Sequence, residues 1–93
     1  MKLRYERGAL ADLNEIFTYV AADNPEAAAH LVESIELVAA RIAALPHIGG
    51  TTRRVGFRHF AVANYLIVYE IAGDTVIVHY VRHRARRRPW VGE

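Results

Sequence analysis

The chain has 93 residues, of which 53% are hydrophobic and 24% charged, with 12 basic and 10 acidic side chains and no cysteine. This length corresponds to a single domain, 1–93, and excludes large cofactor-binding folds and multidomain enzymes. The lack of cysteine excludes disulfide frameworks, thiolate nucleophiles and thiolate metal ligands. No apolar run is long enough to span a membrane, and the N-terminus lacks the apolar core of a signal peptide, so we expect a soluble, cytoplasmic protein.

Charge is distributed unevenly along the chain. Residues 1–45 hold four basic and seven acidic side chains, a net charge of −3, whereas residues 46–93 hold eight arginines and three acidic side chains, a net charge of +5. The arginine guanidinium is a planar fork of donors that suits carboxylates and phosphates. The C-terminal half is therefore predicted to meet an anionic partner.

The first half of the chain is predicted to form a short strand and two helices. Apolar and charged residues alternate over 2–5, which is typical of a strand with one apolar face. Apolar residues then recur at helical spacing over 9–22 and again over 25–45. Between these stripes, Asp23-Asn24-Pro25 supplies cap residues and a proline suited to the first helical position. The pattern predicts two antiparallel amphipathic helices.

The second half is predicted to form three strands and a basic tail. Residues 53–62 form the first strand, with Val55 and Phe57 facing the interior, and residues 64–81 form a hairpin whose turn contains Gly73. The fold class is α+β: two antiparallel helices packed on a small, mainly antiparallel sheet, in the order βααβββ, with a basic C-terminal tail.

Five short segments carry a family resemblance through their order and spacing. They are Ala11-Asp12-Leu13-Asn14-Glu15-Ile16-Phe17-Thr18-Tyr19, Leu45-Pro46-His47-Ile48-Gly49, Arg58-His59-Phe60, Tyr65-Leu66-Ile67-Val68-Tyr69 and Val81-Arg82-His83-Arg84-Ala85-Arg86. With these segments the chain resembles the RelE/ParE superfamily of toxins from type II toxin-antitoxin systems. The resemblance implies a toxin that arrests growth when free. It also implies a cognate antitoxin, whose C-terminal segment wraps the toxin in a hetero-oligomeric complex, and no cofactor.

The superfamily divides by target. RelE-like members resemble ribonucleases that cut messenger RNA in the ribosome, using sheet lysines and arginines and a C-terminal tyrosine. Here Leu66 stands where the resemblance would place a sheet arginine, and no lysine follows Lys2. The only aromatic residue beyond Tyr80 is Trp90, which cannot act as an acid or a base near neutral pH. The chain is therefore more similar to ParE-like members, which bind and inhibit DNA gyrase.

The arginine-rich C-terminus is the predicted target-binding segment. Its candidate residues are Arg82, His83, Arg84, Arg86, Arg87, Arg88 and Trp90. Arginine and tryptophan are enriched among residues that dominate binding energy, and closely spaced arginines repel one another unless they meet an anion. The alternative is a solvated terminus whose charges only aid solubility.

Two further functions stay open. A RelE-like nuclease would act on the ribosome and messenger RNA through Arg58, His59, His83 and Arg86, with a histidine replacing the missing base. The other possibility is an inactive relative that only binds the antitoxin.

The resemblance places the antitoxin on the first helix and on an edge of the sheet. Candidate contacts are Leu13, Phe17, Val20, Arg53 and Arg54. The three apolar residues are also suited to the core. The two arginines are equally suited to a cleft shared with Arg58 or to pairing with helix carboxylates such as Glu33 and Glu36.

Other polar residues are predicted to be structural. His79 is expected to be a hydrogen-bonded sheet histidine facing away from the side of Val78, and Asp12 and Glu15 are expected on the solvated outer face of the first helix. The histidine spacing does not favour a metal site, because the closest pair, His79 and His83, lies at a strand end.

Overall fold

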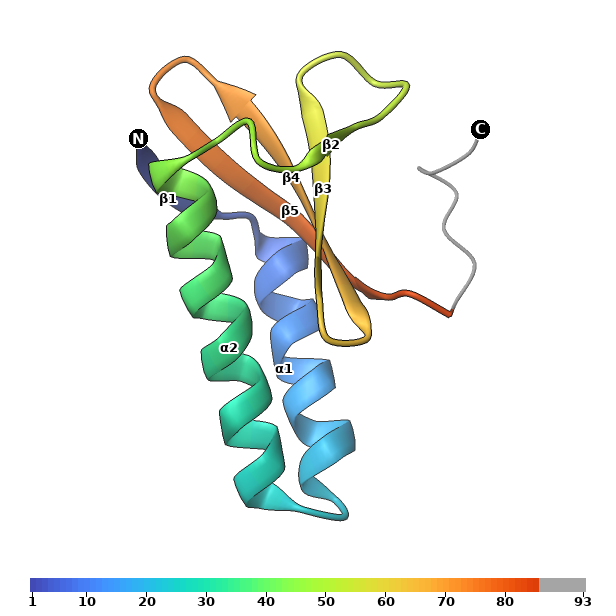
Figure 1. Cartoon of the computed structure of the whole chain (residues 1–93). Coiled ribbons are helices and arrows are strands. Elements are labelled where there is room, and N and C mark those ends of the chain that lie inside the picture. Colours follow the sequence, from blue (N-terminus) through green and yellow to red (C-terminus); the bar gives the residue numbers. More distant parts are fainter. Residues whose placement is uncertain (86–93) are drawn as a thin grey trace.

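The computed structural model describes residues 1–85, which form two helices and one five-stranded sheet (Figure 1). In chain order the elements are β1 (Lys2–Tyr5), α1 (Arg7–Ala21), α2 (Pro25–Ala44), β2 (Gly50–Thr51), β3 (Phe57–Val62), β4 (Tyr65–Ala72) and β5 (Thr75–His83). The predicted α+β fold is confirmed, with the two-residue strand β2 added between α2 and β3, where no strand was predicted.

One strand was predicted too long at its start. β3 begins at Phe57, and Val55 is 96% exposed, so the expectation that Val55 faces inward was wrong. The backbone N–H of Phe57 bonds to the carbonyl of Arg54, and Gly56 adopts a positive φ of 85°. Residues 53–56 therefore turn into the sheet instead of extending it, and glycine suits that conformation.

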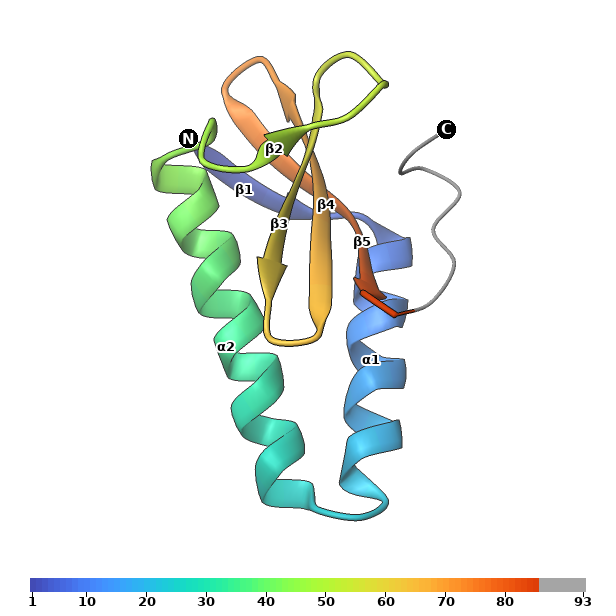
Figure 2. The ribbon, with the colours of Figure 1, turned by 45° about the vertical axis from the view of Figure 1, so that its right-hand side comes forward.

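The strand order in the sheet is β1-β5-β4-β3-β2. β1 runs parallel to β5, and all other pairs are antiparallel. β1 pairs only with Thr75–Val78, so among residues 1–85 the second half of β5 has no neighbouring strand on that side. This short free edge lies next to α1, as Figure 2 shows.

Both helices pack on the same face of the sheet, and the corner that joins them extends beyond its end (Figures 1 and 2). Asn24 caps α2 by accepting a hydrogen bond from the backbone of Ala27 at 3.1 Å, and Pro25 occupies the first turn. Buried alanines let the elements approach closely, and Ile35 and Ile42 fill the space between them. No helix in residues 1–85 has the length and apolarity needed to cross a bilayer.

The core lies between the helices and one side of the central strands. Tyr69, Val76 and Val78 are fully buried there, together with Ile67 and Val81 at 0% and 2% exposure. Because side chains alternate along a strand, the intervening residues of β4 and β5 face the other side of the sheet, which carries neither of the two helices of residues 1–85 and is called here the open face.

Candidate functional site

The end of β5 is the root of the basic tail, and its polar side chains point in different directions. Arg82 pairs with Asp12 of α1. His83 turns to the helix side, where its ring meets that of Tyr65 edge-on with centroids 5.2 Å apart. Arg84 is exposed. Of the predicted target-binding residues in the described part of the chain, Arg84 presents its charge most openly.

The backbone of the tail root is also anchored. The N–H of Arg84 donates to the carbonyl of Asn64 at 2.7 Å, in the turn between β3 and β4, and the N–H of Ala85 donates to Nδ1 of His83 at 3.1 Å. The remaining predicted target-binding residues, Arg86, Arg87, Arg88 and Trp90, lie outside the described residues.

Asp12 was expected on a solvated helix face, and that expectation was wrong. Its side chain is 13% exposed, its Oδ2 accepts a hydrogen bond from the backbone N–H of Val81 at 2.9 Å, and its Oδ1 pairs with Arg82. The N–H of Val81 has no strand partner, because β1 ends opposite Val78. Asp12 supplies the missing acceptor at this edge. Glu15, one turn further along, is exposed as predicted.

An open groove of about 810 Å³ runs between α1 and this end of the sheet. Its lining includes Asp12, Glu15, Tyr19, Tyr65 and His83. Carboxylates, aromatic rings and an imidazole meet here, and a partner seated in the groove would contact both α1 and the tail root.

A β-bulge places two consecutive rings on the open face. Val78 and Val81 both face the core, although two residues lie between them, whereas regular alternation would allow only one. The extra residue is accommodated because the pairing of β4 with β5 shifts at Val68/Tyr69. His79 and Tyr80 therefore both face the open side, with ring centroids 6.2 Å apart. His79 is a sheet histidine as predicted.

These rings belong to a row that crosses the open face. The guanidinium of Arg54 lies 4.2 Å from the ring centroid of Phe57, whose ring is 4.9 Å from that of His79. At the other end, the guanidinium of Arg82 lies 4.8 Å from the ring centroid of Tyr80. We call Arg54, Phe57, His79, Tyr80 and Arg82 the cation-aromatic row. Contacts of this kind are worth about 0.5–1 kcal/mol at exposed positions, so the row holds its arginines in place.

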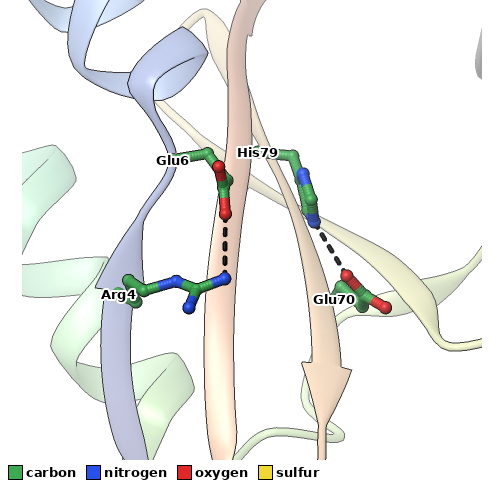
Figure 3. Close-up of polar contacts among 4 residues, drawn as sticks. All are labelled: Arg4, Glu6, Glu70 and His79. Carbon is green, nitrogen blue, oxygen red and sulfur yellow. Dashed lines mark hydrogen bonds and ion pairs between the residues drawn. The ribbon is translucent and has the colours of Figure 1, made fainter.

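One polar pair includes His79 of the row, and a second pair lies on the same side of the sheet (Figure 3). Nε2 of His79 lies 2.9 Å from Oε1 of Glu70 on the neighbouring strand. An Arg4 guanidinium nitrogen donates to Oε1 of Glu6, also at 2.9 Å. The Glu70 contact fixes the His79 ring where it stacks on Phe57, so His79 acts here as a structural link.

The residues of the nuclease alternative do not come together in the described part of the chain. Arg58 lies on the helix side and donates to the carbonyls of Gly49, at 2.7 Å, and His47, at 3.4 Å. Its neighbour His59 lies on the open face, because adjacent side chains of a strand point to opposite sides. His83 is on the helix side at another edge. Arg58, His59 and His83 therefore share no pocket.

The predicted antitoxin contacts fall into three environments. Leu13 is 8% exposed and belongs to the core, Val20 is half-buried, and Phe17 is 40% exposed on α1. Arg53 is exposed, whereas Arg54 belongs to the cation-aromatic row and pairs with neither predicted helix carboxylate in the structure described. Phe17 and Arg53 are thus the members of this set most available to a partner.

Two exposed residues of α1 and two members of the cation-aromatic row were not predicted from the sequence as candidate site residues. Leu10 and Tyr19 are 54% and 74% exposed on α1, and Phe57 and Tyr80 form part of the cation-aromatic row. One sequence signal for the bulge exists: two residues, His79 and Tyr80, separate the apolar residues Val78 and Val81. Within residues 1–85 no group of three or more histidine and carboxylate side chains is placed to hold a metal ion.

Comparison with known proteins extends over nearly the whole chain. Residues 3–88 match the family model of the ParE toxin of the type II toxin-antitoxin system parDE. The "Putative toxin Y4kP" of Sinorhizobium fredii (strain NBRC 101917 / NGR234) is 33% identical over 92 residues, covering 97% of this chain and 95% of that protein.

Two solved structures share the fold. One is a chain of the chromosomal ParDE system from P. aeruginosa, with a TM-score of 0.77, 23% identity, and 89% of this chain and 95% of that chain covered. The other is a chain of the RelBE2 toxin-antitoxin complex from Mycobacterium tuberculosis, with a TM-score of 0.64, 23% identity, and 89% and 96% covered. The sequence matches and the shared fold place the chain in one group: it belongs to the ParE toxin family of type II toxin-antitoxin systems, within the RelE/ParE superfamily.

Proposed function

We propose that this toxin acts in the cytoplasm by binding and inhibiting DNA gyrase, and that a cognate antitoxin neutralises it. The observation that carries the proposal is the dispersal of the nuclease candidates: Arg58 is engaged with loop carbonyls, and His59 and His83 lie on opposite faces of the sheet. Cleavage of RNA needs acid, base and cationic groups around one phosphate. The described residues do not supply such a group.

Leu66 supports the same conclusion. It is 8% exposed on the open face and pairs across strands with Arg82 and Ala61. An apolar side chain at this position offers no charge to a developing phosphorane, and the nearby Arg82 is already paired with Asp12. A ParE-like inhibitor that binds its target without chemistry needs no such charge.

The target-binding surface in this proposal is the tail that begins at Arg84. Arg84 is exposed at the end of an anchored strand, and three more arginines and a tryptophan follow in sequence. A row of arginines with an aromatic anchor fits an acidic patch on a protein target. The ordered root gives this segment a fixed point of departure.

The antitoxin would occupy a different surface. Leu10, Phe17 and Tyr19 expose apolar or aromatic area on α1, and Tyr19 also lines the groove that ends at the tail root. An antitoxin segment that buries these side chains would lie across α1 and approach the tail. In this placement one partner would cover both the groove and the root of the target-binding segment.

The test is supercoiling of relaxed plasmid by gyrase with increasing amounts of the purified toxin, with and without its antitoxin. We expect inhibition that the antitoxin relieves. If folded toxin leaves supercoiling unchanged, the gyrase proposal fails. Cleavage of ribosome-bound messenger RNA in a parallel reaction would then establish a RelE-like nuclease, and inactivity in both assays would indicate a relative that only binds the antitoxin.

A further inference from the structure

Asp12 ties the first helix to the point where the basic tail leaves the sheet. One carboxylate oxygen accepts the N–H of Val81 and the other pairs with the guanidinium of Arg82, so a single side chain binds both the backbone and a side chain of β5. We call these two contacts the Asp12 latch. Both contacts are charge-assisted, and the carboxylate is only 13% exposed, which strengthens them relative to a surface pair.

The latch determines what Arg82 can do. Its guanidinium lies between Asp12 and the ring of Tyr80, so its charge is neutralised and its orientation is set by the toxin itself. Arg84, two residues later, is exposed. The boundary between an arginine that is paired within the toxin, with its side chain 38% exposed, and an exposed arginine therefore falls between these two positions.

We propose that Asp12 is a positioning residue for target binding: it fixes Arg82 and the end of β5, and so sets the position of Arg84, after which the other arginines of the tail follow in sequence. In this proposal Arg82 affects target binding through its ion pair with Asp12, and its own side chain does not contact the target. This inference rests on the proposed function for its activity readout. Holding the start of a binding segment reduces the conformational entropy lost on binding.

Three variants and one control test the latch in the supercoiling assay. Asp12→Asn removes the ion pair, Arg82→Gln removes it from the other side while Asp12 still accepts the Val81 N–H, and the third variant combines both. Glu15→Gln makes the same charge change one turn along α1 at an exposed side chain. We expect each single variant to raise the half-inhibitory concentration by roughly five- to tenfold, because preorganisation is lost. The double variant should inhibit gyrase at least as strongly as the less inhibitory of the two single variants. Glu15→Gln should inhibit like the wild type.

A direct role of Arg82 predicts a different pattern. If Arg82 contacts the target, Arg82→Gln weakens inhibition, while Asp12→Asn, which frees the guanidinium, leaves inhibition unchanged or improves it. That result overturns the proposal. Circular dichroism checks that each variant folds. If Asp12→Asn does not fold, the fluorescence anisotropy of Trp90 in Arg82→Gln still tests the proposal.

The second readout needs no gyrase. Trp90 is the sole tryptophan, so its fluorescence anisotropy reports on the tail alone. We expect lower anisotropy in Arg82→Gln and in Asp12→Asn than in the wild type and Glu15→Gln. Equal anisotropy in all four proteins overturns the latch. Failure of the wild type to inhibit gyrase removes the proposed target, while the anisotropy still decides whether Asp12 holds the tail.

Discussion

The hydroxyl of Tyr69 is a buried polar group that joins the sheet to the segment after α2. It donates to the carbonyl of Pro46 at 2.7 Å and accepts from the N–H of Gly49 at 3.0 Å. A Cβ on Gly49 would lie 2.6 Å from this hydroxyl and 2.7 Å from the carbonyl oxygen of His59, so only glycine fits there. These contacts place β2 on the sheet edge and hold the loop carbonyls where Arg58 can reach them.

Replacing Tyr69 with phenylalanine leaves the N–H of Gly49 and the carbonyl of Pro46 without this partner. We expect Tyr69→Phe to lower the free energy of unfolding by about 1–3 kcal/mol, the usual cost of leaving buried polar groups unpaired. Urea denaturation followed by circular dichroism measures the change. Tyr19→Phe is the matched control, because Tyr19 is 74% exposed and should stay near the wild type. Equal stability of all three proteins would contradict the assigned hydrogen bonds.

Two tyrosines predict how stability changes in alkali. Burial raises the pKa of Tyr69 above its ordinary value of 10.0, although the Gly49 hydrogen bond and the charge of Arg58 partly oppose the shift. Burial and the nearby charge of Glu36 raise the pKa of Tyr5 in the same direction. Above pH 10.0 the unfolded chain releases these protons first, so the folded chain binds more protons and the free energy of unfolding falls as the pH rises.

The measurement is urea denaturation at a series of pH values from about 9 to 11, the range over which ordinary and raised tyrosines differ. We expect the wild type to lose stability across this range and the double variant Tyr5→Phe/Tyr69→Phe to lose less. A slope as steep in the double variant as in the wild type would assign the alkaline loss to other groups.

At the level of elements, α1 carries two neighbouring apolar side chains with opposite surroundings. Leu13 lies in the core, whereas Phe17, one turn later, is 40% exposed. We expect Leu13→Ala to lower the free energy of unfolding by about 2–4 kcal/mol, as for other buried leucines. Phe17→Ala should change stability by less than about 1 kcal/mol, as is usual at the surface, but weaken antitoxin binding at least tenfold.

Thermal denaturation and calorimetric titration with the antitoxin separate the two effects. Antitoxin affinity that Phe17→Ala leaves unchanged would move the antitoxin away from this face of α1. Loss of affinity in folded Leu13→Ala but not in Phe17→Ala would instead indicate that the core residue is exposed in the complex.

Local sequence patterns were sufficient for most elements and insufficient for the site. The helical stripes and the hairpin depend on neighbouring residues, and they were predicted within a few positions. The role of Asp12 depends on a contact 69 residues away, at Val81, and the sequence of α1 holds no sign of it. Val55 fits a strand by composition, yet the turn at Gly56 excludes it from the sheet. The site depends on contacts between elements, which periodicity does not report.

At the level of the whole molecule, opposite charges are separated along the chain. The acidic excess lies in residues 1–45, which include both helices, and the basic excess lies in residues 46–93. Asp12 and Arg82 link these two parts at the root of the tail. At the root of the tail the carboxylate of Asp12 is therefore already matched by an arginine, and the exposed Arg84 follows.

This arrangement predicts that fold and target binding can be separated at Ala85. Both helices, all five described strands and the hydrophobic core lie within residues 1–85, so a chain that ends at Ala85 should keep the circular dichroism spectrum of the full-length protein and a single cooperative thermal transition. Gyrase inhibition should be lost, because three arginines and Trp90 are removed.

A full-length variant with Arg86, Arg87 and Arg88 changed to glutamine separates charge from chain length. Loss of inhibition in both proteins indicates recognition of an anionic surface. Full inhibition by the truncated chain would place the target contacts on the described part of the toxin, where Arg84 and the cation-aromatic row would be the next residues to change.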